Sequence, residues 1–160
     1  MPTYRPALKT DLRAICALGE EVNWLHHGAF PHIFAGHGPA ERDLAHWASS
    51  VETEGSETFV AECEGQVVGY ITVTIATESH SFVQPLKFGR VGTVSVAASK
   101  RGLGIGPELM RLAHAWVKER GGHEVRLNVW AFNEHALHVY RELGYEVRSF
   151  NLAKVVASDS

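Results

Sequence analysis

The order of hydrophobic and polar positions along the chain predicts alternating strands and helices. Apolar residues recur at helical spacing in residues 11–21, 39–50, 107–120 and 134–143. Strand-like runs occupy residues 4–8, 58–63, 66–76, 90–97, 125–130 and 146–152. Residues 23–38 and 78–89 are predicted as connections. A strand, two helices, a strand meander and then strands alternating with helices predict an α/β (α+β) fold with a mixed sheet.

Composition places the chain among ordinary globular proteins. Its 160 residues are 45% hydrophobic and 21% charged, with a formal net charge of −3. This length favours one domain over residues 1–160. The small negative charge gives no general attraction to nucleic acid or anionic membranes, and no apolar run is long enough to cross a bilayer. The start lacks a signal-peptide core, and Cys16 and Cys63 have no metal spacing, so a cytoplasmic protein with reduced thiols is expected.

A glycine-rich turn joins the strand predicted at 90–97 to the helix predicted at 107–120. Its sequence is Arg101-Gly102-Leu103-Gly104-Ile105-Gly106. Backbone N–H groups at the start of a helix bind phosphate, and glycine both permits close approach and adopts positive φ. The turn therefore predicts a phosphate-binding loop. A glycine-rich helix start without a ligand is the alternative.

Three known phosphate loops can be compared with this turn. A Walker A loop needs Lys-Ser or Lys-Thr after its last glycine, and neither follows Gly106. A Rossmann loop needs an acidic residue about twenty positions on, where this chain has Arg126. The third pattern, Arg/Gln-x-x-Gly-x-Gly/Ala, is matched in full.

A second motif follows after one predicted helix and one predicted strand. Asn133, Ala136, Tyr140 and Leu143 are spaced so that they share one face of a helix. Gly144 then ends that helix. Packing in the core is the simpler interpretation of Ala136 and Leu143, and it is an alternative for Tyr140.

The two motifs, in this order, resemble the GCN5-related N-acetyltransferase (GNAT) family and its Asn-x-x-Ala-x-x-x-Tyr-x-x-x-Gly-Phe/Tyr segment. The resemblance covers nearly the whole chain, although the motifs lie in its second half. It implies a single GNAT-like domain with a mixed, mostly antiparallel central sheet of about six to seven strands flanked by about four helices. It also implies an acyltransferase that transfers groups other than amino-acyl groups: an acetyl-CoA-dependent N-acetyltransferase that works by direct transfer.

The resemblance assigns roles to individual residues. The backbone of the site strand would hold the pantetheine arm and polarise the thioester carbonyl, and the turn would hold the pyrophosphate. Asn133 would bind the pantetheine arm, a role compatible with capping its own helix. Tyr140 would be the catalytic acid that protonates the departing thiolate, since a phenol has a pKa of about 10. The predicted cofactor-binding residues are Val94, Ser95, Val96, Arg101, Gly102, Leu103, Gly104, Ile105, Gly106 and Asn133.

The general base is not carried over from the family. Many relatives place a glutamate near the positions of Gly92 and Thr93, and this chain has no carboxylate there. Histidines of the early loop (His26, His27 and His32) or groups of the later connection (Glu78 and His80) are the candidates. Alternatively, the amine binds in its neutral form and needs no base.

The chain has ten histidines, and five of them cluster early: His26, His27, His32, His37 and His46. None has a metal-ligand spacing such as His-Glu-x-x-His, so no metal is expected.

The early loop is unusually aromatic, and it lies where the resembled fold forms its acceptor pocket. The predicted substrate-binding residues are Trp24, His27, Phe30, Phe34 and Trp130. Such a wall suits a primary amine, on a small molecule or a peptide, with an apolar or planar part. A lid that packs on the core is the alternative.

Other functions stay open at this point. A different acyl group, such as succinyl, needs more room near Val94 and Trp130. A CoA-binding sensor without chemistry would explain the missing carboxylate, and a nucleotide-binding domain is a third option. Many relatives pair through late strands, so a homodimer is also an expectation.

Overall fold

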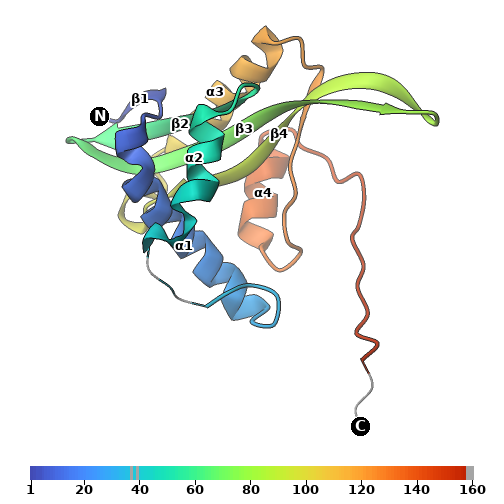
Figure 1. Ribbon diagram of the computed structural model, residues 1–160, viewed down its shortest axis with the longest axis horizontal. Helices are drawn as coiled ribbons and strands as arrows, with labels where there is room; N and C mark the ends of the chain where they lie inside the picture. Colours follow the sequence, from blue (N-terminus) through green and yellow to red (C-terminus); the bar gives the residue numbers. More distant parts are fainter. Residues whose placement is uncertain (37, 39, 158–160) are drawn as a thin grey trace. The chain divides into compact units, whose positions relative to one another are not determined.

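The computed structural model of the protein describes residues 1–36, 38 and 40–157 (Figure 1). Pro39, the predicted start of the second helix, and His37 of the histidine cluster lie outside the described residues. The chain divides into two compact units, Met1–Asn128 and Val129–Ser160. The expected single domain over residues 1–160 stays a prediction. No helix in the described parts of the chain is long and apolar enough to span a membrane.

The first unit contains a five-stranded sheet with the order β1-β2-β3-β4-β5. Neighbouring strands are antiparallel except β4 and β5, which are parallel. This confirms a mixed, mostly antiparallel sheet, but the prediction of six to seven strands is wrong. The strands are β1 (Thr3–Pro6), β2 (Ser56–Cys63), β3 (Gln66–His80), β4 (Val83–Val96) and β5 (Glu124–Arg126).

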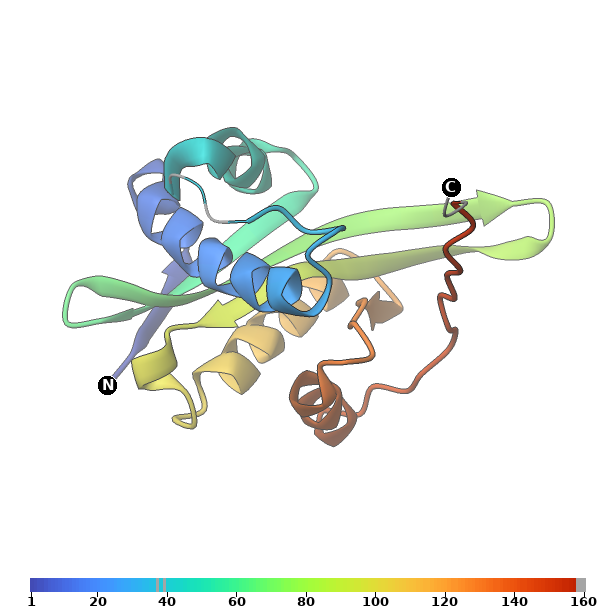
Figure 2. The same ribbon diagram turned by 90° about the horizontal axis from the view of Figure 1, so that it is seen from below.

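Helices cover both faces of this sheet. Figure 2 shows α1 and α2 on one face and α3 on the other. Single turns of 3-10 helix precede α1, α2 and α3. The helices of the first unit are η1 (Lys9–Asp11), α1 (Leu12–Ala29), η2 (Ala40–Asp43), α2 (Leu44–Glu52), η3 (Ala98–Lys100) and α3 (Ile105–Glu119).

The long hairpin of β3 and β4 replaces a predicted connection. Residues 78–89 were expected to be a loop, but the two strands pair as far as His80 and Val83. Phe82 at the tip is 89% exposed. Pairing with a neighbouring strand satisfies the backbone hydrogen-bonding groups whatever the hydrophobic pattern is. The pattern of residues 78–89 therefore does not reveal that the hairpin extends so far.

Helix α1 is longer than predicted. The expected end near Glu21 is wrong, because the helix continues to Ala29 and takes in His26 and His27. Phe30 caps it by donating its N–H to the carbonyl of His26 (2.8 Å). Pro31 follows directly, and the residue before a proline disfavours helical geometry, which explains this end.

Two apolar layers enclose the sheet. Ile15, Leu18 and Trp47, from α1 and α2, are buried with residues of β2 and β3. On the other face α3 buries one stripe at helical spacing, formed by Ile105, Leu109, Ala113, Trp116 and Val117. The stripe fixes α3 against β3 and β4, and with it the position of the glycine turn.

The second unit contains α4 (Glu134–Glu142) and an extended tail. The predicted strand at 146–152 is absent from the described residues, and Phe150 and Leu152 are exposed there. A strand needs a hydrogen-bonded neighbour, and the described part of this unit offers none. The strand predicted at 125–130 is likewise shorter than expected and ends at Arg126.

An ion pair ties the first strand to the start of α1 and predicts acid sensitivity. Asp11 accepts hydrogen bonds from both terminal nitrogens of Arg5 (2.7 and 2.9 Å) and from the N–H of Leu8 (2.7 Å). The Arg5 guanidinium lowers the pKa of the Asp11 carboxyl. A lowered folded-state pKa gives stability that is full above the unfolded value of about 3.9 and is lost as pH falls below it.

Asp11→Asn is therefore expected to lower the free energy of unfolding at pH 7 by about 2 kcal/mol. It should also flatten the loss of stability seen in the wild type below about pH 4. Urea unfolding at a series of pH values measures both effects. Asp43→Asn, whose side chain is 45% exposed, is the control. Equal stability of wild type and Asp11→Asn at pH 7 would contradict this prediction.

Candidate functional site

The glycine turn starts α3 through two left-handed residues. Arg101 has extended backbone angles, Gly102 has φ of 78° and Gly104, the N-cap of α3, has φ of 82°. An L-residue with a side chain costs about 1–2 kcal/mol in this conformation. Glycine is therefore required by the geometry of the turn.

The first turn of α3 presents free backbone donors. The first hydrogen bond of the helix runs from the N–H of Glu108 to the carbonyl of Gly104 (3.2 Å), and Pro107 has no N–H. The N–H groups of Ile105 and Gly106 therefore have no partner within the helix. A Cβ added at Gly102 or Gly104 would meet no described atom within 4 Å, so the space over the turn is open. These features fit a bound pyrophosphate.

At the end of β4, the backbone N–H and C=O groups of successive residues point alternately to the two edges of the strand. Thr93 donates its N–H to Oγ1 of Thr72 (3.0 Å), and Ala97 donates its N–H to the carbonyl of Val68 (2.7 Å). Both partners, Thr72 and Val68, lie in β3. The backbone groups of the odd-numbered residues 93–97 therefore face β3. Because backbone groups alternate along a strand, residues 94 and 96 face the opposite edge.

That opposite edge is open beside the turn. The parallel partner β5 pairs with β4 only at residues 88–90, so in the described chain no strand covers Val94 and Val96. Arg101 donates from Nε to the carbonyl of Val96 (3.1 Å) and joins the turn to this edge. An open edge next to a turn that fits a pyrophosphate suits an extended arm with amide groups, as in pantetheine.

The other predicted cofactor-binding residues of this unit differ in how far their side chains are exposed to solvent. Ser95 is buried, and its hydroxyl donates to the carbonyl of Leu18 (3.4 Å). Ile105 is buried, so it offers only its N–H, while Leu103 is 66% exposed. The Arg101 side chain is exposed, and its Nη2 lies 4.0 Å from Oε2 of Glu21.

The second unit holds the predicted Asn133 and Tyr140 on α4. Asn133 caps the helix, since its side chain accepts from the N–H of Ala136 (3.2 Å). Tyr140 is half-buried, its ring lies 5.9 Å from that of Tyr145, and burial raises the pKa of its phenol. The phenol is therefore protonated at neutral pH, as an acid must be.

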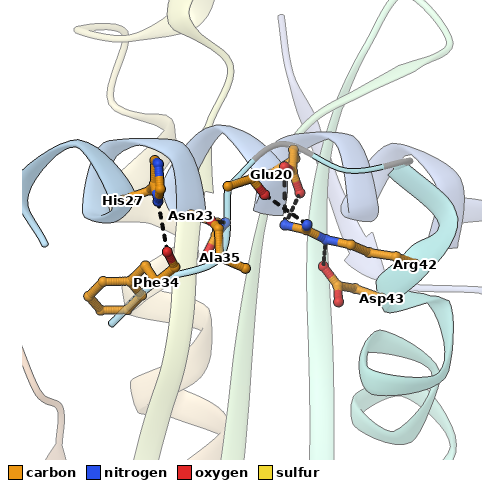
Figure 3. Close-up of polar contacts among 8 residues, drawn as sticks. Glu20, Asn23, His27, Phe34, Ala35, Arg42 and Asp43 are labelled. Atoms are coloured by element: carbon orange, nitrogen blue, oxygen red, sulfur yellow. Dashed lines mark hydrogen bonds and ion pairs between the residues drawn. The ribbon is translucent and has the colours of Figure 1, made fainter. Parts of the chain in front are cut away.

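A cleft of about 330 Å³ lies between α1, α2, the loop after α1 and β4. The loop is held along α1 by two hydrogen bonds (Figure 3): Asn23 donates to the carbonyl of Ala35 (2.8 Å), and Nδ1 of His27 donates to the carbonyl of Phe34 (2.7 Å). The cleft is lined by Gly19, Val22, Asn23, His26, Phe34, His46, Trp47 and Thr93.

Only one predicted acceptor residue of the first unit lines this cleft. Phe34 does so, whereas Trp24 stacks on His27 (5.3 Å between rings) and Phe30 packs on His32 (6.1 Å). Trp130 belongs to the second unit. A role in substrate binding stays a prediction for all five residues.

Sequence reasoning missed most of the cleft. Gly19, Val22, Asn23 and His26 stand at spacings of three, four and seven from the first, which is one face of α1. Placing the end of the helix near residue 21 hid this pattern. The contributions of α2 and β4 have no comparable sequence pattern, because they depend on how these elements pack.

The structure also gives a reason for the missing strand carboxylate. A Cβ added at Gly92 would lie 2.7 Å from Oγ1 of Thr72, so this position cannot take a side chain without a shift. Thr93 lines the cleft but has no proton-accepting group of suitable basicity. Among the described residues no group of three or more His, Cys, Asp or Glu is arranged to hold a metal.

Comparison with known proteins identifies the family. The model of the acetyltransferase (GNAT) family matches residues 20–145, which is most of the chain. The protein therefore belongs to the GNAT acetyltransferase family, with an α+β GNAT fold that has five strands and four α-helices in the described residues. The match crosses the boundary between the two units and includes both motifs.

Curated relatives are acetyltransferases. An N-alpha-acetyltransferase of Sulfurisphaera tokodaii is 36% identical over 92 residues, which are 55% of this chain and 55% of that protein. A streptothricin acetyltransferase of Streptomyces lavendulae is 33% identical over 95 residues, which are 59% of this chain and 47% of that protein. The matched region thus spans about half the length of these relatives.

Solved structures share the fold. A variant of the BH1408 protein from Bacillus halodurans has a TM-score of 0.91 at 20% identity, covering 97% of this chain and 99% of that chain. The aminoglycoside N-acetyltransferase AAC(6')-Iy, in complex with CoA, has a TM-score of 0.74 at 19% identity, covering 98% of this chain and 96% of that chain.

Proposed function

We propose that this chain transfers an acetyl group from acetyl-CoA directly to a primary amine of a small molecule or a peptide. The observation that carries the proposal is the junction of β4 and α3. An open strand edge at Val94 and Val96 leads straight into a turn whose free N–H groups are those of Ile105 and Gly106. Membership of the GNAT family and the CoA complex of a structural neighbour support the same interpretation.

Each part of the site has a task in this proposal. The turn and Arg101 bind the pyrophosphate, and the open edge of β4 binds the pantetheine amides. The side-chain amide of Asn133 donates to the same arm, since its oxygen is used by the helix cap. Bound acetyl-CoA supplies an acetyl group activated as a thioester. Tyr140 donates the proton that the leaving sulfur needs.

The cleft between α1 and α2 is the proposed acceptor site. It reaches Thr93, the residue directly before Val94 on β4, so an amine in it can approach the open strand edge. Its lining includes the rings of His26, Phe34, His46 and Trp47, and no carboxylate is among the lining residues that the structure describes. The proposal therefore favours an amine with a planar or apolar part over a polycation.

A thermal-shift titration tests the cofactor site. The wild type is expected to melt at a higher temperature with acetyl-CoA and with CoA than without ligand, because a ligand that binds only the folded state stabilises it. NAD and ATP are expected to produce no comparable shift. Gly104→Trp, which fills the open space over the turn, is expected to weaken acetyl-CoA binding at least about tenfold, a loss of about 1.4 kcal/mol.

Gly121→Trp is the matched control. Gly121 also has positive φ (78°) and open space around it, but it lies just after the other end of α3. Both variants should suffer similar backbone strain, and only Gly104→Trp should lose the ligand-induced shift. The absence of a shift with any CoA thioester in the wild type would refute the proposed function. An equal loss of the shift in both variants would remove the turn from the binding site.

The acceptor class is tested by a screen of arylalkylamines, aminoglycosides and short peptides with free N-termini. Mass spectrometry detects the added acetyl group, and release of free thiol measures its rate. Faster turnover of arylalkylamines than of aminoglycosides is expected, because rings line the cleft and none of the described lining residues is a carboxylate. The opposite preference would overturn this part of the proposal.

A further inference from the structure

His26 is oriented in the cleft by a hydrogen bond that fixes its tautomer. Its Nδ1 lies 2.8 Å from the carbonyl oxygen of Val22, one turn earlier on α1. A carbonyl only accepts, so Nδ1 carries the hydrogen. In the neutral ring the lone pair is therefore on Nε2, the nitrogen that can take up a proton. A ring held in this way is prepared to act as a base.

The position of His26 connects it with both proposed substrates. It is half-buried, lines the cleft together with Thr93, and packs against Phe34 (5.0 Å between rings). Thr93 immediately precedes the strand edge that would hold the thioester. His26 therefore lines the same cleft in which the amine would meet the acetyl group.

The other early histidines are placed differently. His27 uses Nδ1 for the carbonyl of Phe34 and stacks on Trp24, and it does not line the cleft. His32 packs on Phe30 outside the cleft. His46 does line the cleft, but from α2; the residue is exposed, and its ring packs edge-on against that of Trp47 (4.6 Å between ring centres).

We propose that His26 is the general base of the transfer, in place of the strand carboxylate that this chain lacks. The inference rests on the proposed function. The amine nitrogen forms a bond to the thioester carbonyl carbon and the C–S bond breaks. The proton lost by nitrogen passes to Nε2 of His26, and the sulfur takes a proton from Tyr140. His26 then releases its proton to solvent and the Tyr140 phenolate takes one up from solvent, so the enzyme returns to its starting state and the reaction needs no further reactant.

The charged and titratable groups around His26 define the expected pH dependence. From α2 the cleft contains His46, whereas the loop contributes Phe34 and β4 contributes Thr93, neither of which titrates near neutral pH. On α1 itself, Glu20 pairs with Arg42 (2.9 Å). A base must be neutral to work, so kcat/KM is expected to fall towards acid pH as the imidazole becomes protonated.

His26→Gln tests the proposal, because glutamine keeps a polar group near the position of Nε2 but is not basic. The expected result is a fall in kcat of about 100-fold and the loss of the acid limb of kcat/KM. His46→Gln, in the same cleft, is the matched control and should keep that limb. The acceptor is a weakly basic arylamine, which stays neutral over the whole pH range, so the limb reports the enzyme alone.

A second measurement needs no substrate. Nitrogen-15 NMR of the imidazoles in the free protein should show His26 with hydrogen on Nδ1 at high pH. The opposite tautomer would overturn the proposal, as would His26→Gln with wild-type kcat and an unchanged acid limb. Failure of the wild type to bind acetyl-CoA would instead reject the proposed function, so the two failures are distinguishable.

Discussion

Tyr140→Phe is expected to lower kcat by about 100-fold while leaving the affinity for acetyl-CoA almost unchanged. The change removes one hydroxyl and keeps the ring, so α4 and its packing should survive. Without the phenol, the departing thiolate has no side-chain proton donor in the proposed mechanism. Steady-state kinetics with the best acceptor of the screen measure kcat, and the acetyl-CoA thermal shift measures binding.

Tyr145→Phe provides the matched control for this experiment. Its ring lies 5.9 Å from that of Tyr140 in the same unit, and burial also raises the pKa of its phenol. The Tyr145→Phe variant loses the same hydroxyl group, but Tyr145 has no proposed role in catalysis. Its kcat should therefore stay within about twofold of the wild type. Turnover by Tyr140→Phe at the wild-type rate would remove Tyr140 from the mechanism.

The pH profile gives a further check on Tyr140. Burial raises the pKa of its phenol above the ordinary value of about 10. An acid is active only while protonated, so kcat should show no loss from this group through neutral and mildly alkaline pH. Together with the acid limb assigned to His26, the activity should rise from acid pH to a broad alkaline plateau. A fall of kcat already below about pH 9 would argue against Tyr140 as the acid.

Gly89→Ala is expected to lower the free energy of unfolding by about 3 kcal/mol. Gly89 lies in β4 beneath α3, and a Cβ there would overlap Cγ2 of Val117 and lie 3.0 Å from its Cγ1. Val117 is a buried, β-branched side chain with little freedom to turn away. The clash would separate α3 from β4, the two elements whose junction forms the proposed cofactor site.

A double-mutant cycle isolates this clash. Val117→Ala alone is expected to cost about 2 kcal/mol, because it leaves a small cavity. In the Gly89→Ala background the same change removes the atoms in the way, so the double variant should be more stable than additivity predicts by about 1 kcal/mol or more. Urea unfolding followed by circular dichroism measures all four proteins. Strictly additive effects would show that the close approach of Gly89 and Val117 does not limit stability.

The amino-acid sequence was sufficient to predict the local geometry of the proposed cofactor site. Glycines at positions 102 and 104 match the positive φ of the turn, and the helical spacing of apolar residues predicted the helix at 107–120, where the structure has α3 (Ile105–Glu119). Asn133 and Gly144 mark the two ends of α4 as expected. These features are local, because a backbone angle, a helix cap or a helical period depends on residues a few positions apart.

Only the tertiary structure decided the number of strands, the length of the hairpin and the composition of the proposed acceptor cleft. Whether residues such as 78–80 or 146–152 form a strand depends on a hydrogen-bonded neighbour that no local pattern specifies. His26, Trp47 and Thr93 come from three elements, and packing of α1 and α2 on the sheet brings them to one cleft. Local sequence thus determined the glycine turn, whereas long-range packing determined which side chains line the cleft, because contacts between distant residues leave no periodicity in the chain.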